Sequence, residues 1–149
     1  MGRIIKVERN DAMRLLPAAR LFAHEANLPG RFNADNFIST IVSLFDSGIL
    51  FCYGIDGEDG VDGGIGGITH QDLTSGDKVA MELFWFMKPE VRGSRDAIRL
   101  FDAYEQEAKA RGCRRVMMVT ICGLGDERIS ELYKRRGYTE FERHFIKDL

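Results

Sequence analysis

Residues 88–97 have the composition expected of an anion-binding site. A strand-like run ends there, a short loop with Gly93 follows, and a long helix begins at about Ser94. A helix start exposes unpaired amide donors and carries the positive end of the helix dipole, so it can bind a phosphate. Three cations follow over two turns of this loop and the helix after it: Arg92, Arg95 and Arg99. A cation in the first turn of a bare helix is unfavourable, because it lies at the positive end of the helix dipole. A bound polyanion would make the same cation favourable. The alternative is a solvated loop whose charges have no function.

Apolar periodicity and turn residues predict the elements that position this segment. Strands are expected at 3–8, 49–55, 61–71, 81–87, 115–121 and 138–146, and helices at 12–26, 33–46, 94–110 and 126–136. Asp11 is expected to cap the first helix, and the glycine-rich segment 61–71 lies in the middle of an antiparallel meander. The order is therefore β-α-α-β-β-β-α-β-α-β. It predicts one α/β domain over residues 1–149, with a single mixed sheet covered by helices on both faces.

Two segments carry a family resemblance. Residues 81–95 read MELFWFMKPEVRGSR, and residues 132–138 read LYKRRGY. The first resembles the fourth strand and following loop of the GCN5-related N-acetyltransferases, the GNAT family, and the second resembles that family's Leu-Tyr-x-x-x-Gly-(Phe/Tyr) signature. The resemblance is strong from residue 81 to 149 and only topological before that. It implies the GNAT acyl-CoA N-acyltransferase fold and a short, single-domain member of bacterial or phage type.

The resemblance implies acetyl-CoA as cosubstrate, bound by a (Gln/Arg)-x-x-Gly-x-(Gly/Ala) loop that contacts its pyrophosphate. In this sequence the loop comprises Arg92, Gly93, Ser94, Arg95, Asp96 and Ala97. Arg95 replaces the central glycine, so its side chain rather than a close backbone approach would hold the anion. Asp96 brings a carboxylate near the anion and is interpreted as a helix N-terminal acid that points away.

Three further residues are implied to contact the cofactor. Backbone groups near Phe86 and Met87 would hold the acetyl carbonyl and the pantetheine arm. Asp126 stands where family members often carry Asn, which puts one hydrogen bond to the cofactor in doubt.

Glu82 is the expected catalytic base. A lysine-like amine has a pKa of about 10.4 and is mostly protonated at neutral pH, so something must accept its proton. Glu82 alternates with Ala80, Phe84 and Phe86 on one face of an apolar strand, where a carboxylate is partly desolvated, as a base that works near neutrality requires. The alternative is a structural ion pair.

Tyr133 is the expected catalytic acid. It shares a helix face with Ile129 and Leu132, and its phenol can donate a proton while the ring stays anchored in apolar surroundings. The resemblance implies that it reprotonates the departing CoA thiolate. The alternative is core packing.

Composition disfavours several other function classes. The 149 residues include 21 basic and 23 acidic side chains, for a net charge of −2, so nucleic acid is not the expected partner. The longest apolar runs have five residues, far short of the roughly 20 that span a bilayer, so no membrane partner is expected. The histidines and cysteines lack metal-ligand spacing, so no metal is expected. An odd number of cysteines and the absence of a leader pattern favour the cytoplasm.

The activity implied is direct transfer of an acetyl group to a primary amine of a small molecule or protein, with the acceptor unassigned. The alternative is a CoA-binding or non-catalytic interaction module of the same fold, in which Arg95 and Asp96 weaken cofactor capture. Similar proteins often dimerise, which leaves a homodimer open.

Overall fold

A computed structural model describes residues 2–149. The contacts between residues divide the chain into two compact units, one up to Met117 and the other from Met118 to Leu149. The first unit carries the β-sheet and most of the helices, and the second carries α4 (Asp126–Arg135). Among the described residues, no helix has the length and apolar character needed to cross a membrane.

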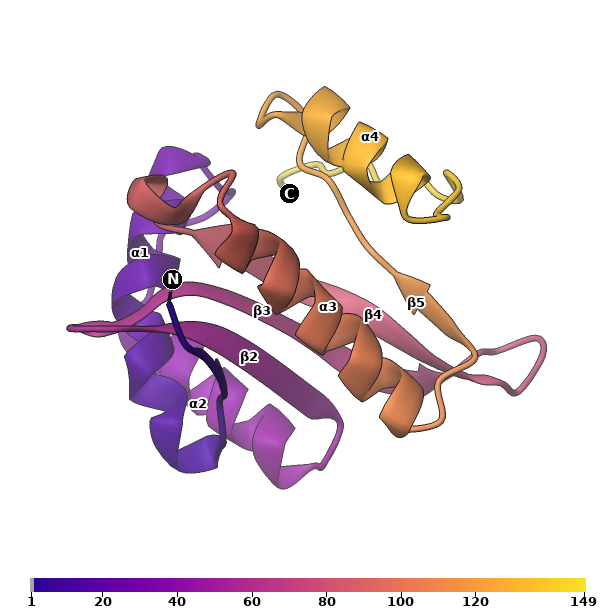
Figure 1. The fold of residues 1–149 in the computed structure, drawn as a ribbon, viewed down its shortest axis with the longest axis horizontal. Coiled ribbons are helices and arrows are strands. Elements are labelled where there is room, and N and C mark those ends of the chain that lie inside the picture. The colour runs from indigo at the N-terminus through magenta and orange to yellow at the C-terminus, as the bar shows by residue number, and fades with distance from the viewer. Residues whose placement is uncertain (1) are drawn as a thin grey trace. The chain divides into compact units, whose positions relative to one another are not determined.

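The first unit is built on a five-stranded mixed sheet with the order β1-β2-β3-β4-β5 (Figure 1). The strands are β1 (Ile4–Lys6), β2 (Leu50–Gly57), β3 (Gly60–Gln71), β4 (Lys78–Met87) and β5 (Arg115–Met117). The first four pair antiparallel, and β5 runs parallel to β4. The predicted α/β class with a mixed sheet is confirmed.

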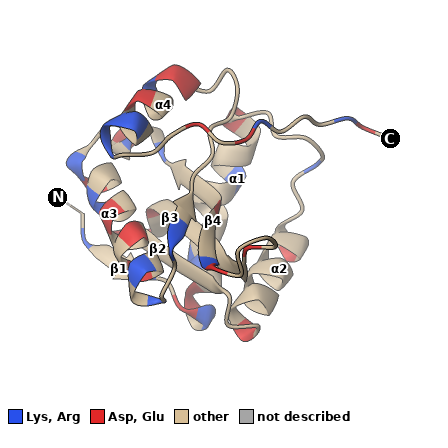
Figure 2. Ribbon diagram, turned by 90° about the vertical axis from the view of Figure 1, so that its right-hand side faces the viewer, with Lys and Arg blue, Asp and Glu red and all other residues tan. Residues whose placement is uncertain are grey.

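Helices cover both faces of this sheet (Figures 1 and 2). One face carries η1 (Arg9–Leu15), α1 (Leu16–Glu25) and α2 (Ala34–Asp46), and the other carries α3 (Arg95–Ala110). The core under the first group includes Leu15, Ile41, Cys52 and Phe86.

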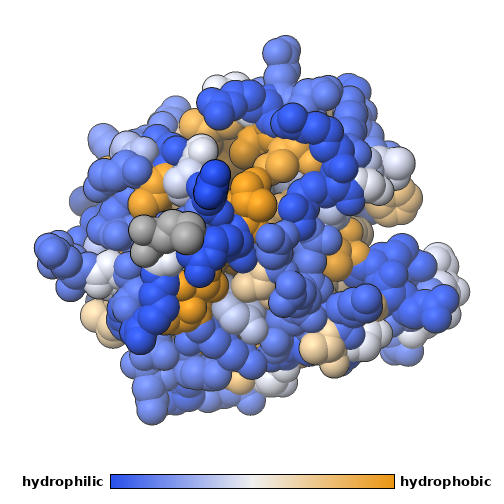
Figure 3. Space-filling model, in the orientation of Figure 1, coloured by the Kyte–Doolittle hydropathy of each residue, from blue (hydrophilic) through white to orange (hydrophobic). Residues whose placement is uncertain are grey.

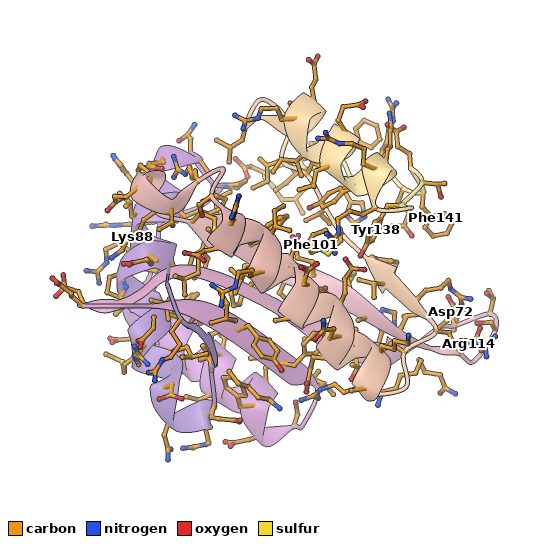
Figure 4. The ribbon with its side chains drawn as sticks, viewed as in Figure 1. Asp72, Lys88, Phe101, Arg114, Tyr138 and Phe141 are labelled. Atoms are coloured by element: carbon orange, nitrogen blue, oxygen red, sulfur yellow. The ribbon has the colours of Figure 1, made fainter. Side chains whose placement is uncertain are left out.

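Stacked aromatic rings join α3 to the sheet. Phe51 stacks on Tyr104 with ring centroids 4.9 Å apart, and Trp85 stacks on Phe101 at 5.1 Å; Figure 4 labels Phe101 on α3. The outer side of α3 carries charges of both signs (Figure 2), and hydrophilic residues cover most of the face shown in Figure 3. The helix is therefore amphipathic, with its apolar stripe on the sheet.

The glycines of β3 make room for neighbouring aromatic rings. A Cβ on Gly66 would lie 2.5 Å from the ring of Phe84, and one on Gly67 would lie 2.4 Å from the hydroxyl of Tyr104. Successive residues of a strand face opposite sides of the sheet, so rings fill the space on both faces. The glycine-rich composition of residues 63–67 therefore serves packing.

Replacing Gly67 by valine should lower the free energy of unfolding by about 2 kcal/mol, as overpacking of a core does. The Cβ would collide with the Tyr104 hydroxyl and lie 2.9 Å from the backbone carbonyl oxygen of Met81. That carbonyl belongs to the neighbouring strand, so it cannot move aside without disturbing the β3–β4 ladder. Urea denaturation measures the loss, and an unchanged midpoint would contradict this packing.

Two predicted features differ from the structure: the cap of the first helix and the length of the strand at 115–121. Asp11 is not the N-cap residue: η1 begins after Glu8, and Asp11 completes a capping box by accepting a hydrogen bond from the Glu8 amide at 3.1 Å. The strand predicted at 115–121 ends at Met117.

The last predicted strand, at 138–146, is wrong. Residues 138–149 have no regular secondary structure, and Phe141, Phe145 and Ile146 are exposed. These apolar residues do not follow the two-residue alternation of a half-buried strand, because Arg143 and His144 interrupt it. The predicted element order therefore holds up to α4.

Candidate active site

The loop after β4 turns the chain back into α3. Met87 ends β4, a short 3-10 turn η2 (Pro89–Val91) follows, and Gly93 adopts a left-handed φ of +69°. Glycine adopts this conformation without the steric cost that a side chain would add. Lys88 marks this end of the sheet in Figure 4, and Arg114 lies near the other end.

Ser94 fixes the start of α3, where the sequence predicts the helix to begin. Its hydroxyl accepts a hydrogen bond from the Ala97 amide at 3.4 Å and donates one to the Val91 carbonyl at 2.6 Å. Three amides beside this cap have no acceptor among residues 2–149: Gly93, Arg95 and Asp96. Unpaired amides at a helix start are suitable donors for an anion.

The arginines of the loop differ in their partners. The Nε of Arg92 donates to the Met87 carbonyl at 3.0 Å, and its Nη2 forms an ion pair with Glu25 at the end of α1. Arg95 is exposed and forms no ion pair with any described residue. Arg95 is therefore available to an anionic ligand, whereas the Arg92 side chain already has two acceptors. Sequence reasoning missed Glu25, whose only signal was an acid at the last position of a helix.

Asp96 turns its carboxylate toward the start of the chain. The residue is 7% exposed, and it accepts hydrogen bonds from the Gly2 amide at 2.7 Å and from Arg99 at 2.8 Å. The Gly2 hydrogen bond, aided by Arg99, lowers the pKa of the Asp96 carboxyl below its usual value. Only the backbone amide of Asp96 therefore remains for a ligand.

Replacing Asp96 by asparagine should destabilise the protein at neutral pH. A carboxyl whose pKa is lower in the folded than in the unfolded state stabilises the fold fully above the unfolded pKa and less as pH falls through the folded one. The ordinary pKa of an aspartate carboxyl is 3.8. The difference between the two proteins in urea denaturation should therefore be largest near pH 7 and shrink below pH 3.8. A difference independent of pH would contradict the ionised Asp96.

The pairing of β4 with β5 ends at Met81. β5 pairs with β4 only over residues 79–81, so the stretch 82–87 has no β5 partner. This stretch contains the backbone groups of Phe86 and Met87. Phe86 is buried and stacks on Phe84 with ring centroids 5.0 Å apart, so its side chain is occupied by the core and only its backbone remains for a ligand.

A β-bulge at Leu83 decides the face to which Glu82 belongs. Gly66 lies opposite Phe84, and Gly67 lies opposite Glu82. Paired residues share a face, and the Cβ positions of the two glycines point to Phe84 and to Tyr104 of α3 respectively. Glu82 therefore lies on the α3 side and is 6% exposed. The prediction that it shares a face with the two phenylalanines was wrong, because the bulge inserts one residue between them.

The second unit holds the remaining predicted site residues. Tyr133 of α4 is 7% exposed, its hydroxyl donates to the Val119 carbonyl at 2.9 Å, and its ring lies 5.6 Å from that of Tyr138. Asp126 is the first residue of α4. The predicted site residues are thus divided between the units: Glu82 and 86–97 lie in the first, and Asp126 and Tyr133 in the second.

Comparison with known families decides the identity of the fold. The model of the acetyltransferase (GNAT) family matches residues 17–138, which is most of the chain and includes parts of both units. The chain belongs to the GNAT family. The resemblance of residues 81–95 and 132–138 is thereby confirmed, and the chain is classed with the acetyltransferases, a group of transferases. No curated protein matches it.

Solved structures share the GNAT fold over nearly the whole chain. An acetyltransferase of Trypanosoma brucei superposes with a TM-score of 0.75 at 15% identity, covering 100% of both chains. An aminoglycoside acetyltransferase from an uncultured soil metagenomic sample gives 0.79 at 16%, covering 99% of this chain and 95% of that one. A predicted acetyltransferase from Clostridium acetobutylicum, solved with acetyl-CoA, gives 0.79 at 14%, covering 99% and 96%. At these identities the likeness shows the fold alone.

Proposed function

We propose that this GNAT member is an N-acetyltransferase that moves an acetyl group from acetyl-CoA directly to a primary amine of a small molecule or protein. The observation that carries the proposal is the start of α3, where three unpaired amides lie beside an arginine without an ion-pair partner. GNAT acetyltransferases use acetyl-CoA, and these groups fit its diphosphate. The family match includes residues of both units, which supports their acting as one domain.

The cofactor contacts follow from the donors that the first unit leaves available. The amides of Gly93, Arg95 and Asp96 would donate to the diphosphate, and the Arg95 guanidinium would add charge-assisted hydrogen bonds. Ser94 and Ala97 would hold these amides in place through the cap, and Arg92 through its backbone acceptor at Met87.

The acetyl carbonyl and the pantetheine arm would meet the backbone of Phe86 and Met87, in the part of β4 that does not pair with β5. Acetyl-CoA supplies the acetyl group as an activated thioester. The hydrogen bond assigned to Asp126 rests on the family resemblance alone and stays a prediction.

Glu82 is proposed as the base. It is a buried carboxylate on an apolar strand, in the part of β4 that does not pair with β5. It would accept a proton from the acceptor amine, directly or through a water. The amine nitrogen then bonds to the carbonyl carbon as the carbon–sulfur bond breaks, and the second proton that the nitrogen loses balances the one that the thiolate gains. The role requires the Glu82 carboxylate to be ionised when the amine arrives.

Tyr133 is proposed as the acid. Its hydroxyl donates to the Val119 carbonyl, so the phenol is protonated and oriented by a backbone acceptor. It would give its proton to the departing thiolate. Tyr133→Phe keeps the ring and removes both the proton and the hydrogen bond to the Val119 carbonyl, so a loss of kcat at an unchanged melting temperature would support this role.

Two measurements on the purified protein test the proposal. Calorimetry with acetyl-CoA and with CoA should show binding, and mass spectrometry should detect acetylated products in a panel of polyamines, amino acids, aminoglycosides and peptides. Saturable CoA binding without transfer to any amine of the panel would favour the non-catalytic CoA-binding module. No heat with either compound at millimolar concentration would refute both functions.

A further inference from the structure

Glu25 joins the end of α1 to the loop proposed to bind the cofactor. It is the last residue of α1, and its carboxylate pairs with the Nη2 of Arg92, whose Nε donates to the carbonyl of Met87 at the end of β4. We call this ion pair the Glu25–Arg92 bridge. It spans 67 positions in sequence, so local chain geometry does not impose it.

The bridge offsets a local cost in α1. A carboxylate in the last turn of a helix faces the negative end of the helix dipole, which disfavours it. Arg92 supplies the opposing charge, with side-chain exposures of 30% for Glu25 and 46% for Arg92. Among the residues that the structure describes, Arg92 is the ion-pair partner of Glu25, so the charge of Glu25 is directed at the loop.

We propose that Glu25 is a positioning residue for the acetyl-CoA loop. This inference rests on the proposed function. By holding the Arg92 side chain against β4 and α1, Glu25 keeps the segment that presents the Gly93, Arg95 and Asp96 amides in one conformation. A preordered loop loses less conformational entropy when the cofactor binds, so the bridge raises affinity without contacting the cofactor.

A competing role for Glu25 predicts the opposite change in the Kd for CoA when its charge is removed. If the carboxylate only masked Arg92 from the diphosphate, removing its charge would free the guanidinium and tighten CoA binding. If it positions Arg92, removing its charge loosens the loop and weakens binding. The direction of the change in Kd therefore separates the two roles.

The test is a double-mutant cycle on CoA binding by calorimetry. Glu25→Gln and Arg92→Gln should each raise the Kd for CoA about threefold, the size expected from a partly exposed ion pair. The double variant should bind no more weakly than the weaker single variant, because both changes remove one interaction. In the transfer assay, Glu25→Gln should raise the KM for acetyl-CoA by the same factor and leave kcat unchanged.

A matched control separates positioning from general loss of charge or stability. Asp46→Asn breaks the exposed Arg9–Asp46 pair, whose atoms lie 2.6 Å apart, and should leave the Kd for CoA unchanged at a similar melting temperature. An unchanged or lower Kd in Glu25→Gln, or additive losses in the double variant, would overturn the positioning role. Failure of the unmodified protein to bind CoA is a separate result, and it would overturn the proposed function as well.

Discussion

Replacing Glu82 by glutamine should lower kcat for acetyl transfer by about 10²- to 10⁴-fold, the range attributed to general base catalysis. Glutamine has nearly the same shape as glutamate, but its amide cannot accept the proton of the attacking amine. Glu82 is buried opposite Gly67 on the α3 side of the sheet, so solvent cannot readily substitute for it as a base. The Kd for CoA should change little, because the proposed diphosphate donors lie at the start of α3.

Steady-state kinetics with the best acceptor of the amine panel, together with calorimetry, measures both quantities. The control is Asp46→Asn, which also replaces a carboxylate by an amide but at an exposed site. This variant should retain full activity. A kcat within threefold of the unmodified protein would remove Glu82 from the chemistry and leave it a structural role. A loss of CoA binding in Glu82→Gln would instead assign its effect to the fold of β4.

Reversing the charge of Arg95 should raise the Kd for CoA about 30-fold, or roughly 2 kcal/mol, the size of a lost charge-assisted hydrogen bond. Arg95 is the first residue of α3 and has no ion-pair partner among residues 2–149, so its side chain is free to meet an anion. A glutamate at that position would repel the diphosphate at short range. It would also suit the helix dipole better than arginine, so the fold should be no less stable.

The control for Arg95→Glu is Arg9→Glu, which changes the net charge by the same amount at a residue paired with Asp46. It should weaken CoA binding by less than twofold, since Arg9 lies in η1, on the face of the sheet opposite α3, and salt screens exposed charges. Equal losses in both variants would mean that net charge, and not the start of α3, governs binding.

Local sequence signals predicted most of the fold. Ser94 was expected to start the long helix, and its hydroxyl caps α3. The helix at 33–46 was expected from its apolar spacing, and α2 runs over Ala34–Asp46 with Asn33 as its cap. Each of these signals acts within one or two turns of chain, so a single sequence contains it in full.

What sequence reasoning missed depends on contacts between distant residues. The bulge at Leu83 comes from pairing with β3, and it moves Glu82 to the face opposite Phe84. The partner of Arg92 is Glu25, on another helix. A strand at 138–146 would need an edge to pair with. Because β5 ends at Met117, it is too short to provide that edge. Periodicity reports which residues are apolar and does not report their partners.

The amides at the start of α3 are proposed to bind the diphosphate of acetyl-CoA. A titration of the isotope-labelled protein with CoA, followed through the backbone amide resonances by NMR, tests this binding directly. The Gly93, Arg95 and Asp96 amides should shift most in the loop and saturate together at the calorimetric Kd. Saturable CoA binding that leaves these three resonances in place would contradict this proposal.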